Sequence, residues 1–166
     1  MPNQQPIIQS HNGERSFACS PAAVVVMVVD AQERFLLGRH LRRNRWEVVS
    51  GALEARETLV DGALRELREE MGAAIRARPL GVFHANTFRY DENAQYMLSI
   101  YYLMAYEGGS VEPGDDMAPD QFRWARAEEI ANGSPIVCIP SQSWVFDRAI
   151  DCYRQWRGQD VQLQPT

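Results

Sequence analysis

The sequence contains no lysine, so all 17 of its basic residues are arginines. The 22 Asp and Glu residues outnumber them, which gives a formal net charge of -5 and a pI near 5.2. A chain with this balance has no overall positive field of the kind that gathers nucleic acid, so binding to duplex nucleic acid is disfavoured. Any basic contact to a phosphate must come from a planar guanidinium group. Arginines near a candidate site are therefore the candidates for phosphate contacts.

Long apolar segments and paired cysteines are also lacking. No stretch approaches the roughly 18 consecutive apolar residues that suggest a membrane helix, and residues 1–15 lack the basic and apolar parts of a signal peptide. The three cysteines, Cys19, Cys138 and Cys152, have neither metal-ligand nor redox-pair spacing, and we expect reduced core residues. We therefore expect a soluble cytoplasmic protein with no membrane partner.

The apolar pattern predicts one domain of the α/β class, a mixed sheet flanked by helices. Residues 22–29 form a continuous run rich in valine, typical of a strand buried on both faces, and residues 35–37 follow as the second arm of a hairpin. Further strands are expected at residues 46–49, 78–85, 96–106 and 121–125. Further helices are expected at residues 127–131 and 141–156. The polar residues 1–17 and 158–166 are expected to form loose tails.

The strongest helix prediction covers residues 58–71. Thr58 and Asp61 have the spacing of a capping box variant at its start, and Gly72 stands where a C-terminal cap belongs. We expect this helix to begin and end at these residues.

Three carboxylates lie along one edge of that helix. At about 100° per residue, Glu66, Glu69 and Glu70 fall within one arc, beside the arc of apolar residues that faces the core. Like charges three and four residues apart repel each other, so a positive group should offset them. Clustered oxygen ligands suit a hard cation such as Mg²⁺ or Mn²⁺. The simpler alternative for a Glu-Glu pair is a solvated acidic helix face.

The segment around these glutamates resembles the Nudix box, a glycine, five residues, Glu, seven residues, then Arg-Glu-aliphatic-x-Glu-Glu-x-Gly-aliphatic. The residues at its fixed positions are Gly51, Glu57, Arg65, Glu66, Leu67, Glu69, Glu70, Gly72 and Ala73. The resemblance implies a Nudix-type α/β/α sandwich with a central mixed β-sheet, and we expect the Nudix hydrolase domain at residues 18–157.

The resemblance also implies roles for the motif residues. Glu66 and Glu70 look like the main metal ligands, with Glu69 as a further ligand or as the base that activates water, and with the Gly51 carbonyl as a backbone ligand. Glu57 and Arg65 look like a structural pair. The implied activity is hydrolysis of a diphosphate linkage in a nucleoside diphosphate derivative, with Mg²⁺ as cofactor and Mn²⁺ as the alternative.

Substrate contacts lie outside the motif. Arg39 stands where family members often place a phosphate-contacting arginine, and Tyr90 stands where a tyrosine marks many dinucleoside polyphosphate hydrolases. The residues 46–51 resemble members that act on nucleoside triphosphates, although Ala52 replaces the second glycine of the usual Pro-Gly-Gly. The acidic loop before residue 121 carries three further candidates for a distal acid, Asp115, Asp116 and Asp120. We expect the aromatic side chains of His84, Phe83 and Phe88 to be structural.

One function of a different class remains open at this point. The chain could be a non-catalytic Nudix-like module that senses a nucleotide or binds a partner, although its complete set of glutamates argues against this. The family resemblance also allows a homodimer.

Overall fold

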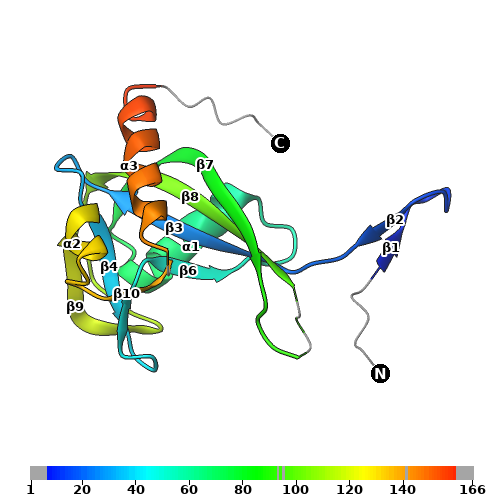
Figure 1. Cartoon of the computed structure of the whole chain (residues 1–166), viewed down its shortest axis with the longest axis horizontal. Coiled ribbons are helices and arrows are strands. Elements are labelled where there is room, and N and C mark those ends of the chain that lie inside the picture. The colour runs from blue at the N-terminus through cyan, green and yellow to red at the C-terminus, as the bar shows by residue number, and fades with distance from the viewer. Residues whose placement is uncertain (1–6, 93, 95, 141, 160–166) are drawn as a thin grey trace.

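The computed structural model describes residues 7–92, 94, 96–140 and 142–159 (Figure 1). The strands are β1 (Ile7–Gln9), β2 (Ser16–Ala18), β3 (Ala22–Val29), β4 (Phe35–His40), β5 (Arg45–Glu47), β6 (Val49–Ala52), β7 (Arg76–Phe88), β8 (Met97–Gly108), β9 (Met117–Ala125) and β10 (Val137–Ile139); the helices are α1 (Leu59–Met71), α2 (Ala127–Ala131) and α3 (Trp144–Trp156). None of these helices is long and apolar enough to cross a membrane.

An eight-stranded mixed sheet forms the centre of the molecule. Its main path runs β10-β5-β4-β3-β8-β7, while β6 pairs with β3 and β9 pairs with β4. Strand β3 runs parallel to β8 along its whole length and antiparallel to β6. Helix α1 packs on one face and α3 on the other (Figure 1), which confirms the predicted α/β/α sandwich.

Strand β3 is buried on both faces, as its unbroken apolar run predicts. Val25, Met27 and Val29 belong to the core under α3, whereas the alternate residues Val24, Val26 and Val28 belong to the core under α1. Successive strand residues point to opposite faces, so this one strand supplies the centre of both cores. We call these the α3 face and the α1 face of the sheet.

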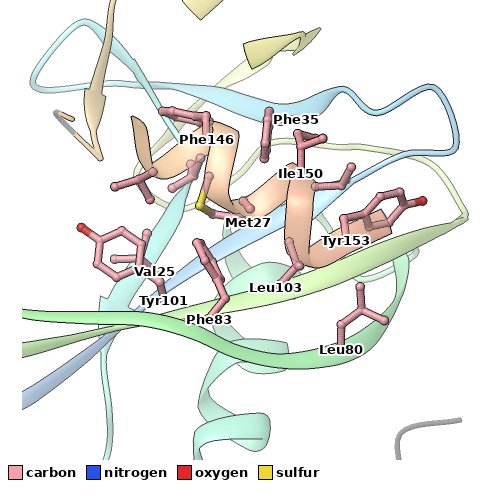
Figure 2. Packing of buried hydrophobic residues seen from close by; sticks show 14 of the residues in the cluster. Val25, Met27, Phe35, Leu80, Phe83, Tyr101, Leu103, Phe146, Ile150 and Tyr153 are labelled. Carbon is pink, nitrogen blue, oxygen red and sulfur yellow. The ribbon is translucent and has the colours of Figure 1, made fainter. Parts of the chain in front are cut away.

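The core on the α3 face is rich in aromatic rings (Figure 2). Phe146 of α3 packs edge-on against Phe35 of β4, with ring centroids 4.9 Å apart. Phe83 of β7 meets Tyr101 of β8 in the same manner at 6.1 Å. Edge-to-face contacts of this kind add to the stabilisation that burial of the rings supplies.

Helix α1 begins and ends as predicted, but one of the two hydrogen bonds at its N-terminal cap differs from that of a capping box. The Thr58 hydroxyl oxygen accepts a hydrogen bond from the Asp61 N–H at 3.2 Å, while the Asp61 carboxylate accepts one from the Thr58 hydroxyl at 2.7 Å. The short Asp side chain therefore binds the cap side chain instead of the cap backbone. At the other end Gly72 has φ 99°, a conformation that favours glycine.

Two predictions about strand pairing are wrong in detail. The hairpin of residues 22–29 and 35–37 pairs only where Val29 meets Phe35, because β4 continues along β5 and β9 instead. The single strand expected at 46–49 is in fact two strands, β5 and β6, with Val48 between them. Strand β5 pairs with β4, whereas β6 pairs with β3. Val48 itself is fully buried in the core on the α3 face.

The predicted ends of the chain and several boundaries also need correction. Part of the expected N-terminal tail forms a hairpin, β1 paired with β2, that stands away from the body of the molecule (Figure 1). Strand β9 begins at Met117, so that Asp120 lies in a strand instead of a loop. Helix α3 begins at Trp144, after the short strand β10 that the pattern did not predict. Residues 1–6 and 160–166 of the expected tails lie outside the described residues.

Candidate active site

Strand β6 brings the first motif glycine against the first motif glutamate on α1. A Cβ atom at Gly51 would overlap the Glu66 carboxylate, so only glycine allows this approach. The next residue, Ala52, is exposed and its side chain meets no such restriction. The replacement of the second glycine by alanine is therefore compatible with the same strand, and the pairing of β6 with β3 remains intact.

Glu66 and Glu70 are the buried acids of α1, with exposed fractions of 8% and 4%. Burial raises the pKa of Glu66 above its ordinary value, although Arg65 acts in the opposite direction. Burial, together with the nearby Glu66 carboxylate, raises the pKa of Glu70 to about 9. The Ser50 N–H lies 3.4 Å from Glu70 Oε2 and favours the ionised form only weakly. Ionisation of both carboxylates is therefore costly, because nearby protein groups offset their charge only in part.

Arg65 is the main cation of the cluster. It holds Glu57 through two hydrogen bonds of 2.6 and 3.0 Å, and its Nη1 donates to Glu66 at 2.8 Å and to Glu69 at 2.9 Å. Its Nη2 also donates to the Ala52 carbonyl at 3.0 Å. The pKa of Glu57 falls to about 2, first because of the Arg65 hydrogen bond and then because of the Glu54 N–H. The guanidinium group therefore ties the loop before α1 to β6 and to the helix.

The acidic loop after β8 brings one distal acid toward the cluster. The N–H groups of Glu112 and Gly114 donate to the Met71 and Glu70 carbonyls at 2.8 and 3.1 Å, which attaches the loop to the last turn of α1. Asp115 follows immediately, and its charge contributes to the raised pKa values of Glu66 and Glu70.

The other two acids predicted as distal candidates are placed differently. Asp116 faces His40 and Arg42, at 4.0 and 3.6 Å. Asp120 is exposed on β9. Of the three candidates, Asp115 is the one whose charge acts on both buried glutamates.

A buried acid that the sequence analysis missed is Glu47 of β5. Its side chain is completely buried; it accepts a hydrogen bond from Arg43 at 2.7 Å and one from the Cys138 thiol at 3.1 Å. Its charge also contributes to the raised pKa of Glu70. The alternation within residues 46–49 places Glu47 on the opposite face from Trp46, and this signal could have drawn attention to it.

The three glutamates of α1 are neighbours, but they do not converge on one point. Among the residues that the structure describes, no group of three or more His, Cys, Asp or Glu side chains forms a ready cation cage. Glu69 is turned toward Arg65, and its side chain is 48% exposed.

The two predicted substrate residues lie apart from each other. Arg39 of β4 donates to the Asn44 side chain at 2.8 Å and stacks over the Trp46 ring, 5.9 Å from its centroid. Tyr90, which is 67% exposed, follows the end of β7 and packs near Phe88, with ring centroids 6.4 Å apart. His84 is half-buried between Tyr101 and Trp144, consistent with the structural role that we expected.

Comparison with known proteins agrees with this fold and motif. The NUDIX domain model matches residues 20–137. The phosphatase NudJ of Escherichia coli is 30% identical over 146 residues, which cover 87% of this chain and 89% of that protein. A NUDIX hydrolase from Nitrosomonas europaea superposes with a TM-score of 0.63 at 14% identity, covering 89% of this chain and 97% of the other. An ADP-ribose pyrophosphatase from Streptococcus suis gives 0.65 at 13% identity, covering 82% and 93%.

The fold and the glutamate-bearing helix are those of Nudix proteins. The chain belongs to the Nudix hydrolase family.

Proposed function

We propose that this protein hydrolyses a diphosphate linkage in a nucleoside diphosphate derivative, such as a (deoxy)nucleoside triphosphate or a dinucleoside polyphosphate. The observation that carries this proposal is the approach of the buried Glu66 carboxylate to the backbone of Gly51, beside the buried Glu70. Burying two carboxyl groups side by side is costly, and groups perturbed in this way mark candidate catalytic sites.

The donor set fits a hard divalent cation, and members of the family generally use one. We propose Mg²⁺, with Mn²⁺ as the alternative, held by Glu66, Glu70 and Glu69 together with the Gly51 carbonyl. All these donors are oxygens. Burial, and then the Glu66 carboxylate, raises the pKa of Glu70, so its ionised form requires a positive group such as a bound cation. When bound, the ion would activate water and neutralise charge on the phosphate oxygens.

Protein groups have separate roles in this proposal. Glu69 has an exposed carboxylate that can accept a proton from the attacking water, so it is our candidate for the base as well as for a third ligand. The Glu57 and Arg65 pair fixes the loop and the helix relative to each other. Water is the nucleophile, so no covalent intermediate is needed.

Arg39 is our candidate for a phosphate contact. The Trp46 ring and Asn44 orient its guanidinium group, and such preorganisation favours planar recognition of phosphate oxygens. Tyr90 remains a prediction for the distant nucleoside of a dinucleoside polyphosphate, because it lies at the tip beyond β7.

A substrate panel tests the proposal. Purified protein with Mg²⁺ would be incubated with dATP, other nucleoside triphosphates, diadenosine polyphosphates, nucleotide sugars and ADP-ribose, and release of phosphate and pyrophosphate would be measured. We expect turnover of one class that disappears in Glu70→Gln and persists in Glu128→Gln, which changes an exposed glutamate on α2. Nucleotide binding without any turnover would instead support the non-catalytic sensing module.

Two further expectations remain predictions. Sedimentation of the full chain would test whether it forms a homodimer, and fractionation of the source cells would test the cytoplasmic location.

A further inference from the structure

The buried acid Glu47 of β5 lies on the α1 face of the sheet, the face that carries the motif glutamates. It pairs with Gly38 of β4, and residues paired in this way point to the same face. A Cβ atom at Gly38 would come within 2.7 Å of the side chain of Met71, the residue that follows Glu70 on α1. Glu47 therefore lies beside the last turn of α1, close to the carboxylates of the candidate site.

Arg43 is the counter-ion of this buried acid. Its Nη2 donates to Glu47 Oε2 at 2.7 Å; the carboxylate is completely buried, whereas the Arg43 side chain is 49% exposed. The Cys138 thiol of β10 donates to the other oxygen of Glu47 at 3.1 Å. One end of the guanidinium group is thus anchored in the fold, and within the described residues it binds no other side chain. Because a guanidinium group has five N–H donors, Arg43 retains donors for an anion.

The loop that carries Arg43 is fixed by hydrogen bonds of its own. His40, which is 6% exposed, accepts hydrogen bonds at its Nδ1 from the N–H groups of Arg42 and Arg43, at 3.2 and 3.3 Å. The Leu41 N–H donates to the Asp116 carbonyl at 2.8 Å, which ties this loop to the acidic loop after β8. That acidic loop is itself attached to the last turn of α1. Arg43 is therefore held at the edge of the carboxylate cluster.

Arg65, the main cation of the cluster, is already occupied. All five N–H groups of its guanidinium donate to the acids and the one carbonyl around it, namely Glu57, Glu66, Glu69 and Ala52. Phosphate oxygens carry negative charge beyond what one divalent cation neutralises, so a diphosphate at this site requires a further cation with available donors. Arg43 has such donors on the same face of the sheet.

We propose that Arg43 makes a second phosphate contact to the diphosphate of the substrate and that Glu47 is the positioning residue that holds its guanidinium group for this contact. The inference rests on the proposed function, because the substrate is the diphosphate compound on which the glutamates would act. The buried carboxylate fixes one edge of the planar group, and the N–H groups on its exposed side can bind two phosphate oxygens side by side.

Binding of an analogue that cannot be hydrolysed between its phosphates tests this inference apart from catalysis. The full chain with Mg²⁺ would be titrated in a calorimeter with the α,β-methylene analogue of ADP. The variants are Arg43→Ala, Glu47→Gln and the double variant that combines them. The double variant guards against misfolding, because it leaves no unpaired charge at the buried position. Arg42→Ala is the matched control, since it removes the same charge one residue away, from a side chain that is 83% exposed.

We expect Arg43→Ala to weaken binding of the analogue about tenfold, as for loss of one charge-assisted contact, and Arg42→Ala to weaken it less than about threefold. If Glu47 acts through Arg43, the double variant should match Arg43→Ala, and Glu47→Gln alone should have an intermediate effect. Mn²⁺ should bind Arg43→Ala at least as tightly as the wild type, because the carboxylates are retained.

The phosphate contact is overturned if Arg43→Ala binds the analogue as tightly as the wild type, or if Arg43→Ala and Arg42→Ala weaken it equally. The positioning role is overturned if the effects of Glu47→Gln and Arg43→Ala multiply in the double variant, because Glu47 would then act independently of Arg43. Failure of the proposed function is a separate result, namely absence of hydrolysis by the wild type across the substrate panel.

Discussion

The Glu66 carboxylate lies against the backbone of Gly51 so closely that a methyl group at position 51 would occupy the same space. In Gly51→Ala, either β6 or the glutamate must move, and Glu66 would lose its position beside Glu70. Because displacement of a catalytic group by about 1 Å can cost about 100-fold in rate, we expect a loss of kcat of about this size. Ala52→Gly, at the exposed neighbouring position, should retain activity. Equal activities of Gly51→Ala and wild type would contradict the assigned geometry.

The pair of Glu57 and Arg65 predicts a dependence of stability on pH. The folded protein lowers the pKa of Glu57 to about 2 from its ordinary value of 4.5, so this carboxylate stabilises the fold fully above pH 4.5. That contribution is lost as the pH falls through this range toward 2. We therefore expect the difference in Tm between wild type and Glu57→Gln to shrink between pH 6 and pH 2.5. A difference that stays constant over this range would show that Glu57 is not held in this ion pair.

Phe146 tests the packing of α3 on the sheet. Its ring is 1% exposed and meets Phe35, so Phe146→Ala removes a large part of the core on the α3 face (Figure 2). We expect the free energy of unfolding to fall by about 3–5 kcal/mol, measured by urea denaturation. Phe122→Ala, at a 38% exposed position on β9, should cost well under half as much. Similar losses in the two variants would argue against the packing described.

Arg39 is expected to act on substrate affinity. In Arg39→Ala we expect KM for the nucleotide to rise about tenfold, as for loss of one charge-assisted contact, with a smaller change in kcat. Asn44→Gly should raise KM less than Arg39→Ala, because it removes the hydrogen-bond partner that orients Arg39 but keeps the guanidinium group, and glycine tolerates the φ of 52° at that position. An unchanged KM in Arg39→Ala would exclude a phosphate contact.

The parts of the fold that depend on local sequence were predictable. The caps of α1 depend on Thr58 and Gly72, and the burial of β3 on both faces follows from its unbroken apolar run. The Nudix box also indicated the family, because its spacing is fixed within one loop and one helix. These features each involve residues that are close together in the chain.

The parts that depend on distant contacts were not predictable. The split of residues 46–49 at Val48 arises because β5 and β6 pair with different strands, and the position of Asp115 depends on hydrogen bonds between its loop and the last turn of α1. The parallel pairing of β3 with β8 likewise depends on the register of strands far apart in the chain, which no local pattern encodes.

The most direct test of the central claim is binding of Mn²⁺ to the full chain, followed by calorimetry or by the electron paramagnetic resonance signal of the free ion. The wild type is expected to bind Mn²⁺ saturably, Glu70→Gln to bind it at least about tenfold more weakly, and Glu128→Gln to match the wild type. If Glu70→Gln binds Mn²⁺ as tightly as the wild type, the buried glutamates of α1 are not the metal site, and the catalytic role proposed for them fails.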